Sequence, residues 1–257
     1  MIRRAGVIAW LALVSAGCGH SIFIPPIGPG VVTDASEAWT AATAACRSAQ
    51  HYSADLKISG RAASQKIWRL AVETAVTPTQ IYMGATFSSQ PIFVLAGSAK
   101  EATLWLRPEQ RVVKAPAGDI IEAILGLPMP PDRLLALLTG CATRSLEVTA
   151  ATSHNGLVAV QTADARVFIE RQGTVWRTRA AEGEGFIVEF RWKTGALPEK
   201  VWISSKPGRE PAAFLDVSVA DPTTSDPIPA SVFNAPSGAA SAEPMTLDEL
   251  RSSRKKS

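Results

Sequence analysis

The chain has few of the side chains, and none of the short motifs, on which most enzymes depend. Its 257 residues include three histidines, three cysteines and two tyrosines. A nucleophile elbow, a phosphate-binding loop, a zinc-protease motif and a dinucleotide-binding glycine pattern are all missing from the sequence. His20 lies in a proline-rich stretch, His51 follows a helical pattern and His154 falls in a turn, so none has the neighbours of a catalytic base. We therefore expect no enzymatic activity, no metal site and no cofactor.

An excess of charge of one sign is also missing. The 26 basic residues nearly balance the 23 acidic residues, which gives a formal net charge of +3. Several of the basic residues end the chain, at Arg251, Arg254, Lys255 and Lys256, so the rest is close to neutral. Because nucleic-acid binding needs a field of positive charge, we expect no nucleic-acid partner. We expect a solvated basic terminus, with contact to anionic lipid head groups as the alternative.

No apolar run reaches the roughly 20 residues that a membrane-spanning helix needs. The apolar run 5–14 follows Arg3 and Arg4 and precedes small residues that end at Cys18, a pattern typical of a signal peptide over residues 1–17. The string VSAGC resembles the bacterial lipobox. This resemblance implies cleavage before Cys18, a diacylglycerol on its sulfur and an acyl chain such as palmitate on the new amino group. An ordinary signal peptide that ends near a cysteine is the alternative.

The residues after Cys18 bear on where such an anchor would be placed. Gly19 follows the cysteine, and in lipoproteins of Gram-negative bacteria a residue other than Asp implies export to the outer membrane, with the protein facing the periplasm. Residues 18–33 are rich in proline and glycine and predict a flexible spacer. Loss of Arg3 and Arg4 with the signal peptide would lower the net charge from +3 to +1.

Two cysteines remain once Cys18 is assigned to the anchor. Cys46 and Cys141 form an even pair, and a disulfide persists in the oxidising periplasm. We therefore predict a disulfide between them. Two buried thiols that act as small apolar side chains are the alternative.

Helical spacing predicts three helices. Asp34–Gln50 has a capping aspartate and a stripe of small and aromatic residues on one face. Asp119–Leu125 and Asp132–Thr139 are strongly apolar, are separated by prolines, and the second ends at Gly140, which can adopt a left-handed conformation. These two helices either seal a core or cover an apolar cavity as a lid, and the pattern allows both.

Most of the remaining chain alternates with a period of two, as half-buried strands do. A tight turn is predicted at His154-Asn155-Gly156, and a solvated hairpin turn at Glu182-Gly183-Glu184-Gly185. The apolar strand positions are Leu56, Ile58, Trp68, Leu70, Val72, Ile81, Met83, Ala85, Ile92–Ala96, Leu104, Leu106, Val158, Val160, Val167, Ile169, Val175, Phe186, Val188, Phe190, Trp192, Val201, Ile203, Leu215, Val217 and Val219.

These elements predict one domain over residues 34–222. Its fold class is mainly β (α+β), with about ten antiparallel strands in a sheet that curls around the helices, because a few helices can cover only one face of such a sheet. Residues 223–257 are rich in proline, serine and alanine and predict a C-terminal tail in which Thr246 to Glu249 cap a final helical turn.

The middle of the chain resembles a known family. The stretch SSQPIFVLAGSAKEATLWLRPEQRVVKAPAGDIIEAILGLPMPPDRLLALLTGC, from Ser88 to Cys141, is similar to LolB-like outer-membrane lipoproteins of the LolA/LolB lipoprotein-localisation superfamily. The resemblance implies a half-barrel sheet with a helical lid around an apolar cavity. It also implies that an acylated lipoprotein is received from a LolA-type carrier and inserted into the outer membrane.

The same resemblance implies site residues. An exposed apolar residue on a loop between early strands serves membrane insertion in the family, and Phe87 in 85–91 is the matching residue, although the usual Gly/Pro/Leu loop is replaced here. Burial of Phe87 in the core is the alternative. The side chains expected to contact acyl chains are Trp68, Leu70, Met83, Leu104, Phe186, Val188, Phe190 and Trp192 from the sheet and Ile121, Ile124, Leu134 and Leu138 from the lid.

Two other functions fit the same sequence. A lipid-binding lipoprotein could carry phospholipid or glycolipid without transferring lipoproteins, since the same cavity serves either cargo. A structural envelope lipoprotein could bind a protein partner with its apolar face. In each case we expect a monomer anchored by lipid.

Overall fold

The computed structural model describes residues 22–25, 30–62, 65–208 and 212–256. The predicted signal peptide and Cys18 lie outside these residues. Within them, no helix has both the length and the apolar character needed to cross a membrane.

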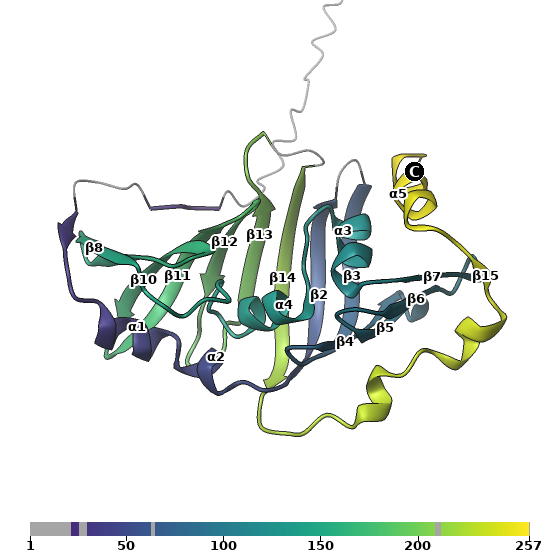
Figure 1. Ribbon diagram of the computed structural model, residues 1–257, viewed down its shortest axis with the longest axis horizontal. Helices are drawn as coiled ribbons and strands as arrows, with labels where there is room; N and C mark the ends of the chain where they lie inside the picture. Colours follow the sequence, from purple (N-terminus) through teal and green to yellow (C-terminus); the bar gives the residue numbers. More distant parts are fainter. Residues whose placement is uncertain (1–21, 26–29, 63–64, 209–211, 257) are drawn as a thin grey trace, which may run out of the picture.

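One curled sheet carries the described part of the chain (Figure 1). Two antiparallel meanders, β2–β7 and β8–β14, join where β14 pairs with β2, and among the described strands only β15 runs parallel to its neighbour, β7. The fold class predicted from alternation is confirmed. In sheet order the strands are β1 (Val31–Val32), β8 (Ala150–His154), β9 (Leu157–Gln161), β10 (Ala165–Gln172), β11 (Val175–Gly183), β12 (Phe186–Arg191), β13 (Lys200–Ser205), β14 (Ala213–Thr223), β2 (Tyr52–Ala62), β3 (Gln65–Val76), β4 (Gln80–Phe87), β5 (Gln90–Ser98), β6 (Ala102–Leu106), β7 (Arg111–Ala115) and β15 (Glu243–Pro244).

The two apolar helices form the crossing between the meanders. The helix α3 (Ala117–Leu125) follows β7, and α4 (Pro131–Leu138) precedes β8, so both lie within the curve of the sheet (Figure 1). Gly126 and Gly140 follow the two helices with φ of 77° and 86°, a conformation that glycine adopts without strain. Pro131, and not the predicted Asp132, begins α4, because proline suits the first position of a helix.

The single helix predicted over Asp34–Gln50 is two short helices. They are α1 (Ser36–Ala42) and α2 (Ala44–Ser48), and Thr43 lies between them. The Thr43 hydroxyl donates to the Trp39 carbonyl (2.7 Å), and such a bond competes with the backbone pattern of a helix. α1 packs on β10 and β11, where Trp39 is 1% exposed.

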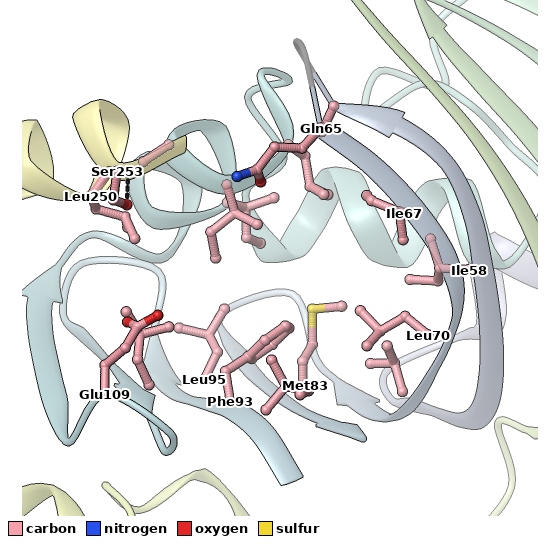
Figure 2. Close-up of a pocket in the computed structure, with 18 residues that line it drawn as sticks. Ile58, Gln65, Ile67, Leu70, Met83, Phe93, Leu95, Glu109, Leu250 and Ser253 are labelled. Atoms are coloured by element: carbon pink, nitrogen blue, oxygen red, sulfur yellow. Dashed lines mark hydrogen bonds between the residues drawn. The ribbon is translucent and has the colours of Figure 1, made fainter. Parts of the chain in front are cut away.

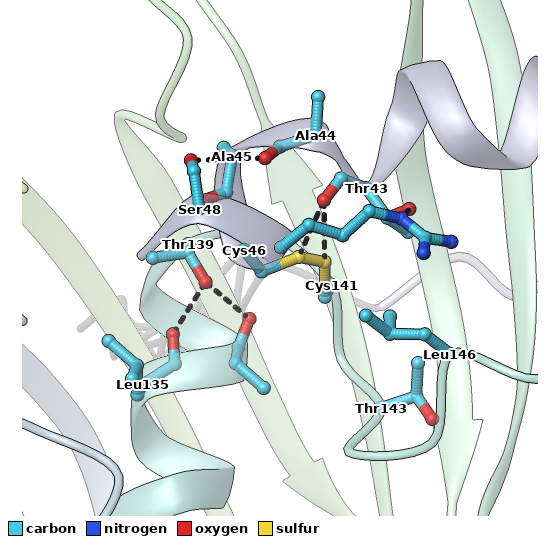
Figure 3. Close-up of a disulfide and its surroundings, with 12 residues drawn as sticks. Thr43, Ala44, Ala45, Cys46, Ser48, Leu135, Thr139, Cys141, Thr143 and Leu146 are labelled. Carbon is cyan, nitrogen blue, oxygen red and sulfur yellow. Dashed lines mark hydrogen bonds between the residues drawn. A yellow bond between two sulfur atoms is a disulfide. The ribbon is translucent and has the colours of Figure 1, made fainter. Parts of the chain in front are cut away.

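A disulfide joins Cys46 in α2 to Cys141 just after α4 (Figure 3). The Cα atoms of the two cysteines are 6.3 Å apart, and 95 positions separate them in the sequence. The predicted pairing is confirmed. It ties the entering helices to the end of the helical crossing.

The described residues of the predicted spacer contact the domain through Phe23 and through β1. The backbone N–H of Phe23 donates to the carboxylate of Glu189 on β12 (3.0 Å), and β1 pairs with β8. Glu189 is otherwise paired with Arg179 (2.9 Å). The described part of the spacer therefore lies along the sheet.

The predicted C-terminal tail also packs against the domain. After β14 it contains η1 (Ala230–Phe233), which contacts β4 and β5, and η2 (Ser237–Ser241), which contacts β6. Gly238 lies against the ring of Trp105, where a Cβ atom would come within 2.1 Å of the ring. β15 then extends the sheet edge, and α5 (Leu247–Lys256) turns back over α3 (Figure 1).

The predicted cap at the start of the last helix is confirmed, and the helix is longer than one turn. The Thr246 hydroxyl accepts from the Glu249 N–H (3.2 Å), and the Glu249 carboxylate accepts from the Thr246 N–H (2.7 Å). This reciprocal pair is a capping box. It fixes where the ten residues of α5 begin.

Asp164, in the turn between β9 and β10, forms hydrogen bonds with the loop that follows α4. Its carboxylate accepts from the Thr143 hydroxyl and from the N–H groups of Arg144 (3.1 Å) and Ser145 (3.3 Å). Partial burial raises the pKa of Asp164, but these hydrogen bonds and the charge of Arg144 together hold the pKa below its ordinary value.

We expect Asp164→Asn to lower the free energy of unfolding by about 2 kcal/mol at neutral pH, because hydrogen bonds to a charged group are lost. A lowered pKa in the folded state stabilises at pH values above the unfolded pKa of about 3.9, and this contribution disappears as pH falls through the folded value. Urea unfolding should therefore show a difference from wild type that shrinks below about pH 4. The exposed Asp55→Asn on β2 is the control.

Candidate functional site

An apolar cavity of about 300 Å³ lies between the β2–β6 part of the sheet and the helices α3 and α5 (Figure 2). Most of its lining is aliphatic. The lining residues are Ile58, Ala62, Gln65, Ile67, Leu70, Val72, Met83, Ile92, Phe93, Leu95, Leu106, Glu109, Ile121, Ala123, Ile124, Leu125, Leu250 and Ser253.

A β-bulge determines which side chains of β3 reach the cavity. Leu70 pairs with Ile58, but the next pair toward the hairpin joins Ile67 to Gly60, so β3 carries an extra residue. Arg69 lies in this bulge and has a φ of +46°. Leu70 and Ile67 therefore both face the cavity although they are three positions apart.

The bulge turns Trp68 away from the cavity, contrary to strict alternation. Its side chain is 58% exposed, with the Lys66 ammonium 4.7 Å and the Arg69 guanidinium 5.9 Å from the ring centre. The predicted inner face of β3 thus holds for Leu70 and Val72 and fails for Trp68. A bulge shifts the alternation by one residue, and the apolar pattern alone does not reveal it.

Helix α3 is the wall of the cavity that faces the sheet. Ile121 and Ile124 line the cavity from it, as predicted for a lid. Met83 lines the cavity from β4 (Figure 2). Ile121 is 4% exposed, whereas Ile124 is half-buried. The two helices of the crossing therefore differ in role: α3 borders the cavity, whereas α4 packs into the core.

Helix α5 borders the cavity with two residues that were not predicted. Leu250 is 6% exposed, and the Ser253 hydroxyl donates to the Leu250 carbonyl (2.9 Å) (Figure 2). Arg111 on β7 holds the start of this helix, since its guanidinium lies 3.5 Å from the Glu249 carboxylate and donates to the Pro244 carbonyl (3.1 Å). The capping pair Thr246 and Glu249 just before Leu250 was the one sequence signal for this wall.

Polar side chains lie at the edges of the cavity. Figure 2 places Glu109 and Ser253 with Leu250 at one end, Gln65 at the start of β3, and Ile58, Ile67 and Leu70 at the opposite end. Glu109 and Ser253 are exposed, whereas Ile58 and Val72 are buried. Such a cavity suits an amphiphile whose apolar part enters and whose polar part stays near Glu109 and Ser253.

The structure does not bring the other predicted contact residues to this cavity. Leu104 is fully buried on β6 without lining it. At β12 the Arg133 guanidinium of α4 lies over the ring of Phe186, 5.4 Å from its centre, and just beyond the strand Trp192 packs against Gly140. The predicted residues in this region do not line the cavity: Leu134, Leu138, Phe186, Val188 and Phe190, all buried, and Trp192, half-buried.

Phe87 lies at the end of β4, in the hairpin that leads to β5. Ser88 and Ser89 form the two-residue turn with φ of 48° and 64°, which suits the twist of a hairpin. The side chain of Phe87 is 45% exposed. It is therefore not packed in the core.

No protein family matches the sequence, and no curated protein does. Among solved structures, the chain is similar to a LolA superfamily protein from Nitrosomonas europaea, with 9% identity and a TM-score of 0.49 over 79% of this chain and 98% of that one. A DUF1329 family protein from Desulfovibrio piger gives 8% identity and a TM-score of 0.49 over 77% and 96% of the chains. A domain from Vibrio parahaemolyticus, named for outer membrane lipoprotein sorting, gives 10% and 0.47 over 78% and 97%.

Among the described residues, no group of three or more His, Cys, Asp or Glu side chains is placed to hold a metal ion. The cavity lining offers one carboxylate, Glu109, and otherwise neutral groups. What the arrangement can do chemically is bind apolar chains and exclude water from them.

Proposed function

We propose that this protein binds acyl chains in the cavity between β2–β6 and α3. The observation that carries the proposal is a cavity lined mostly by aliphatic side chains, with the exposed polar side chains of Glu109 and Ser253 at its edge. Apolar ligands bind such hollows because both surfaces leave water. Binding and release, without an enzymatic step, is the proposed activity.

We further propose that the cargo is an acylated lipoprotein, which a LolA-type carrier delivers and which this protein inserts into the outer membrane. The resemblance of residues 88–141 to LolB-like proteins supports this cargo. The VSAGC string supports a lipid anchor at Cys18, with the cavity domain on the periplasmic side of the membrane. Carriage of another lipid remains the second candidate, since an aliphatic cavity serves either cargo.

A transfer assay tests the function. A soluble form that begins at Gly19 is mixed with a LolA-type carrier loaded with acylated lipoprotein, and the cargo on each protein is then quantified. Transfer to this protein, followed by insertion into liposomes when the lipidated Cys18 form is used, supports the proposal. Bound lipid without transfer indicates a lipid carrier. If neither transfer nor bound lipid is found, a structural envelope protein is the remaining candidate.

We expect Phe87→Ser to lower insertion of cargo into liposomes about tenfold, because an exposed aromatic side chain gains free energy on entering a bilayer interface. Receipt of cargo from the carrier should be unchanged, since Phe87 does not line the cavity. Val175→Ser, at another exposed apolar site, is the matched control. Equal insertion by wild type and Phe87→Ser would remove this residue from the mechanism.

A further inference from the structure

We infer that an exposed surface of β2 and β3 docks on a bilayer that contains anionic phospholipid. Arg61, Lys66, Trp68 and Arg69 together form this docking surface, and all four side chains are exposed. The Trp68 indole enters the membrane interface, and the three cations lie against lipid phosphates. The inference goes beyond the proposed function, because it concerns how the domain meets a membrane and not what occupies the cavity.

Trp68 supplies the apolar part of the docking surface. Its side chain is 58% exposed, whereas the other tryptophans in the described part of the chain are buried or half-buried. The bulge in β3 turns it away from the cavity that Ile67 and Leu70 line. An indole combines an apolar ring with a polar N–H, and tryptophan is therefore enriched where a membrane meets water. Trp68 is thus placed to enter a bilayer interface without a change of fold.

Three cations lie beside this indole. The Lys66 ammonium and the Arg69 guanidinium are 4.7 Å and 5.9 Å from its ring centre, and Arg61 on β2 is the register partner of Lys66. The segment 56–72 contains no acidic residue. Among the described residues, none of the three cations forms an ion pair with a carboxylate. Their charges are therefore available to the phosphates of anionic lipids, and each such contact adds affinity.

The docking surface lies at the end of the sheet that also holds the exposed edge of the cavity. Consecutive antiparallel strands alternate in direction, so the turns β2–β3, β4–β5 and β6–β7 share one end of the sheet. Glu109, at the cavity edge, lies in the β6–β7 turn, and the exposed Phe87 ends β4. Gln65 lines the cavity, whereas its neighbour Lys66 does not (Figure 2). A bilayer on the docking surface therefore meets the sheet where the cavity reaches solvent.

A bilayer fits this surface better than a protein partner does. A stable protein interface buries about 800 Å² on each side and has an apolar centre that is poor in charge. Here one exposed indole is flanked by three cations. A few such residues are sufficient for reversible membrane binding, because apolar burial and attraction to anionic lipid both contribute to affinity.

Sedimentation with vesicles tests the inference. The soluble form that begins at Gly19 is used, because a lipid anchor would bind every vesicle. Vesicles of phosphatidylcholine alone are compared with vesicles in which about a third of the lipid is phosphatidylglycerol. Wild type should bind the anionic vesicles about 100-fold more tightly, since each of the three cations contributes about fivefold. This preference should disappear in about 1 M salt, where charges more than about 3 Å apart are screened.

Variants of the docking surface should lose binding in two distinguishable ways. Lys66→Gln together with Arg69→Gln should lower the affinity for anionic vesicles about 25-fold and leave the affinity for phosphatidylcholine vesicles unchanged. Trp68→Ser should lower the affinity for both kinds of vesicle about tenfold, because it removes apolar contact and no charge. The replaced side chains are exposed, so the fold should survive, and circular dichroism checks it.

Matched controls remove the same kinds of group elsewhere. Arg171→Gln together with Lys193→Gln takes two exposed cations from the other meander, and Val175→Ser takes an exposed apolar side chain from β11. Both controls should bind anionic vesicles as the wild type does. A loss confined to the docking-surface variants therefore separates this surface from the net charge of the protein.

The outcomes distinguish this inference from the proposed function. Wild type that does not bind anionic vesicles, or docking-surface variants that bind them as tightly as the controls do, would overturn membrane docking, with an acidic protein partner as the alternative. Monoacylglycerol binding should be unchanged in every docking-surface variant, because none of the four residues lines the cavity. Failure of wild type to bind a monoacylglycerol would overturn the proposed function while leaving vesicle docking intact.

Discussion

Ile124→Glu should lower the affinity for a monoacylglycerol at least about 100-fold, because an ionised carboxylate in the apolar cavity either remains desolvated or repels the chain. Ile124 is half-buried on α3, so the glutamate can reach water in the free protein, and the fold should survive. The dissociation constant is measured by calorimetry, and circular dichroism confirms that the variant is folded.

The control for Ile124→Glu is Val175→Glu, which adds the same charge at an exposed position on β11, away from the cavity. Its affinity should equal that of the wild type. If the folded Ile124→Glu variant binds with unchanged affinity, acyl chains do not enter this cavity. Leu134→Glu and Leu138→Glu are poor tests, since both leucines are buried and do not line the cavity, and an unpaired charge there would strongly destabilise the fold.

Removal of the disulfide should have the largest effect on stability. With Cys46→Ala and Cys141→Ala together, we expect the free energy of unfolding to fall by about 4 kcal/mol, because the bond closes a long loop, with its cysteines 95 positions apart, in the unfolded chain. For a chain of this size the unfolding midpoint should fall by about 10 °C. Calorimetry measures both quantities.

Alanine is the replacement of choice at Cys141, which is 0% exposed and offers no room for a solvated polar group. Reduction of the wild type should give a similar loss of stability, which separates the cross-link from the substitution. Binding of acyl chains should persist below the new midpoint, since neither cysteine lines the cavity. An unchanged midpoint in both the variant and the reduced protein would show that the cross-link does not stabilise the fold.

Local patterns in the sequence were sufficient for the class of fold. Alternation in Phe186–Arg191 predicts β12, since apolar side chains at every second residue share one face of a strand. The Asn155-Gly156 turn between β8 and β9 follows from two residues that tolerate positive φ, here 50° and 81°. Gly140 ends α4 for the same reason. Each of these features depends only on neighbours along the chain.

The position of the cavity was decided by contacts between distant segments. One extra residue in β3 exposes Trp68 and turns Ile67 inward, and this bulge exists only in the pairing with β2. Four of the twelve predicted contact residues therefore meet in the cavity: Leu70, Met83, Ile121 and Ile124. The predicted residues of β12 and α4 do not line this cavity, and Arg133 and Gly140 pack against Phe186 and Trp192 at that strand and its end.

Helix α5, which forms one wall of the cavity, shows most clearly the difference between what the local sequence determines and what the tertiary structure determines. The sequence by itself determined that Thr246 and Glu249 start a helix, because the capping box is local. It did not determine that this helix lies on α3, since the path of residues 224–245 over η1, η2 and β15 depends on the strand edges and on Trp105. Burial of Leu250 within the cavity wall is therefore a property of the tertiary structure: a side chain finds its apolar neighbours only after the chain has folded back on itself.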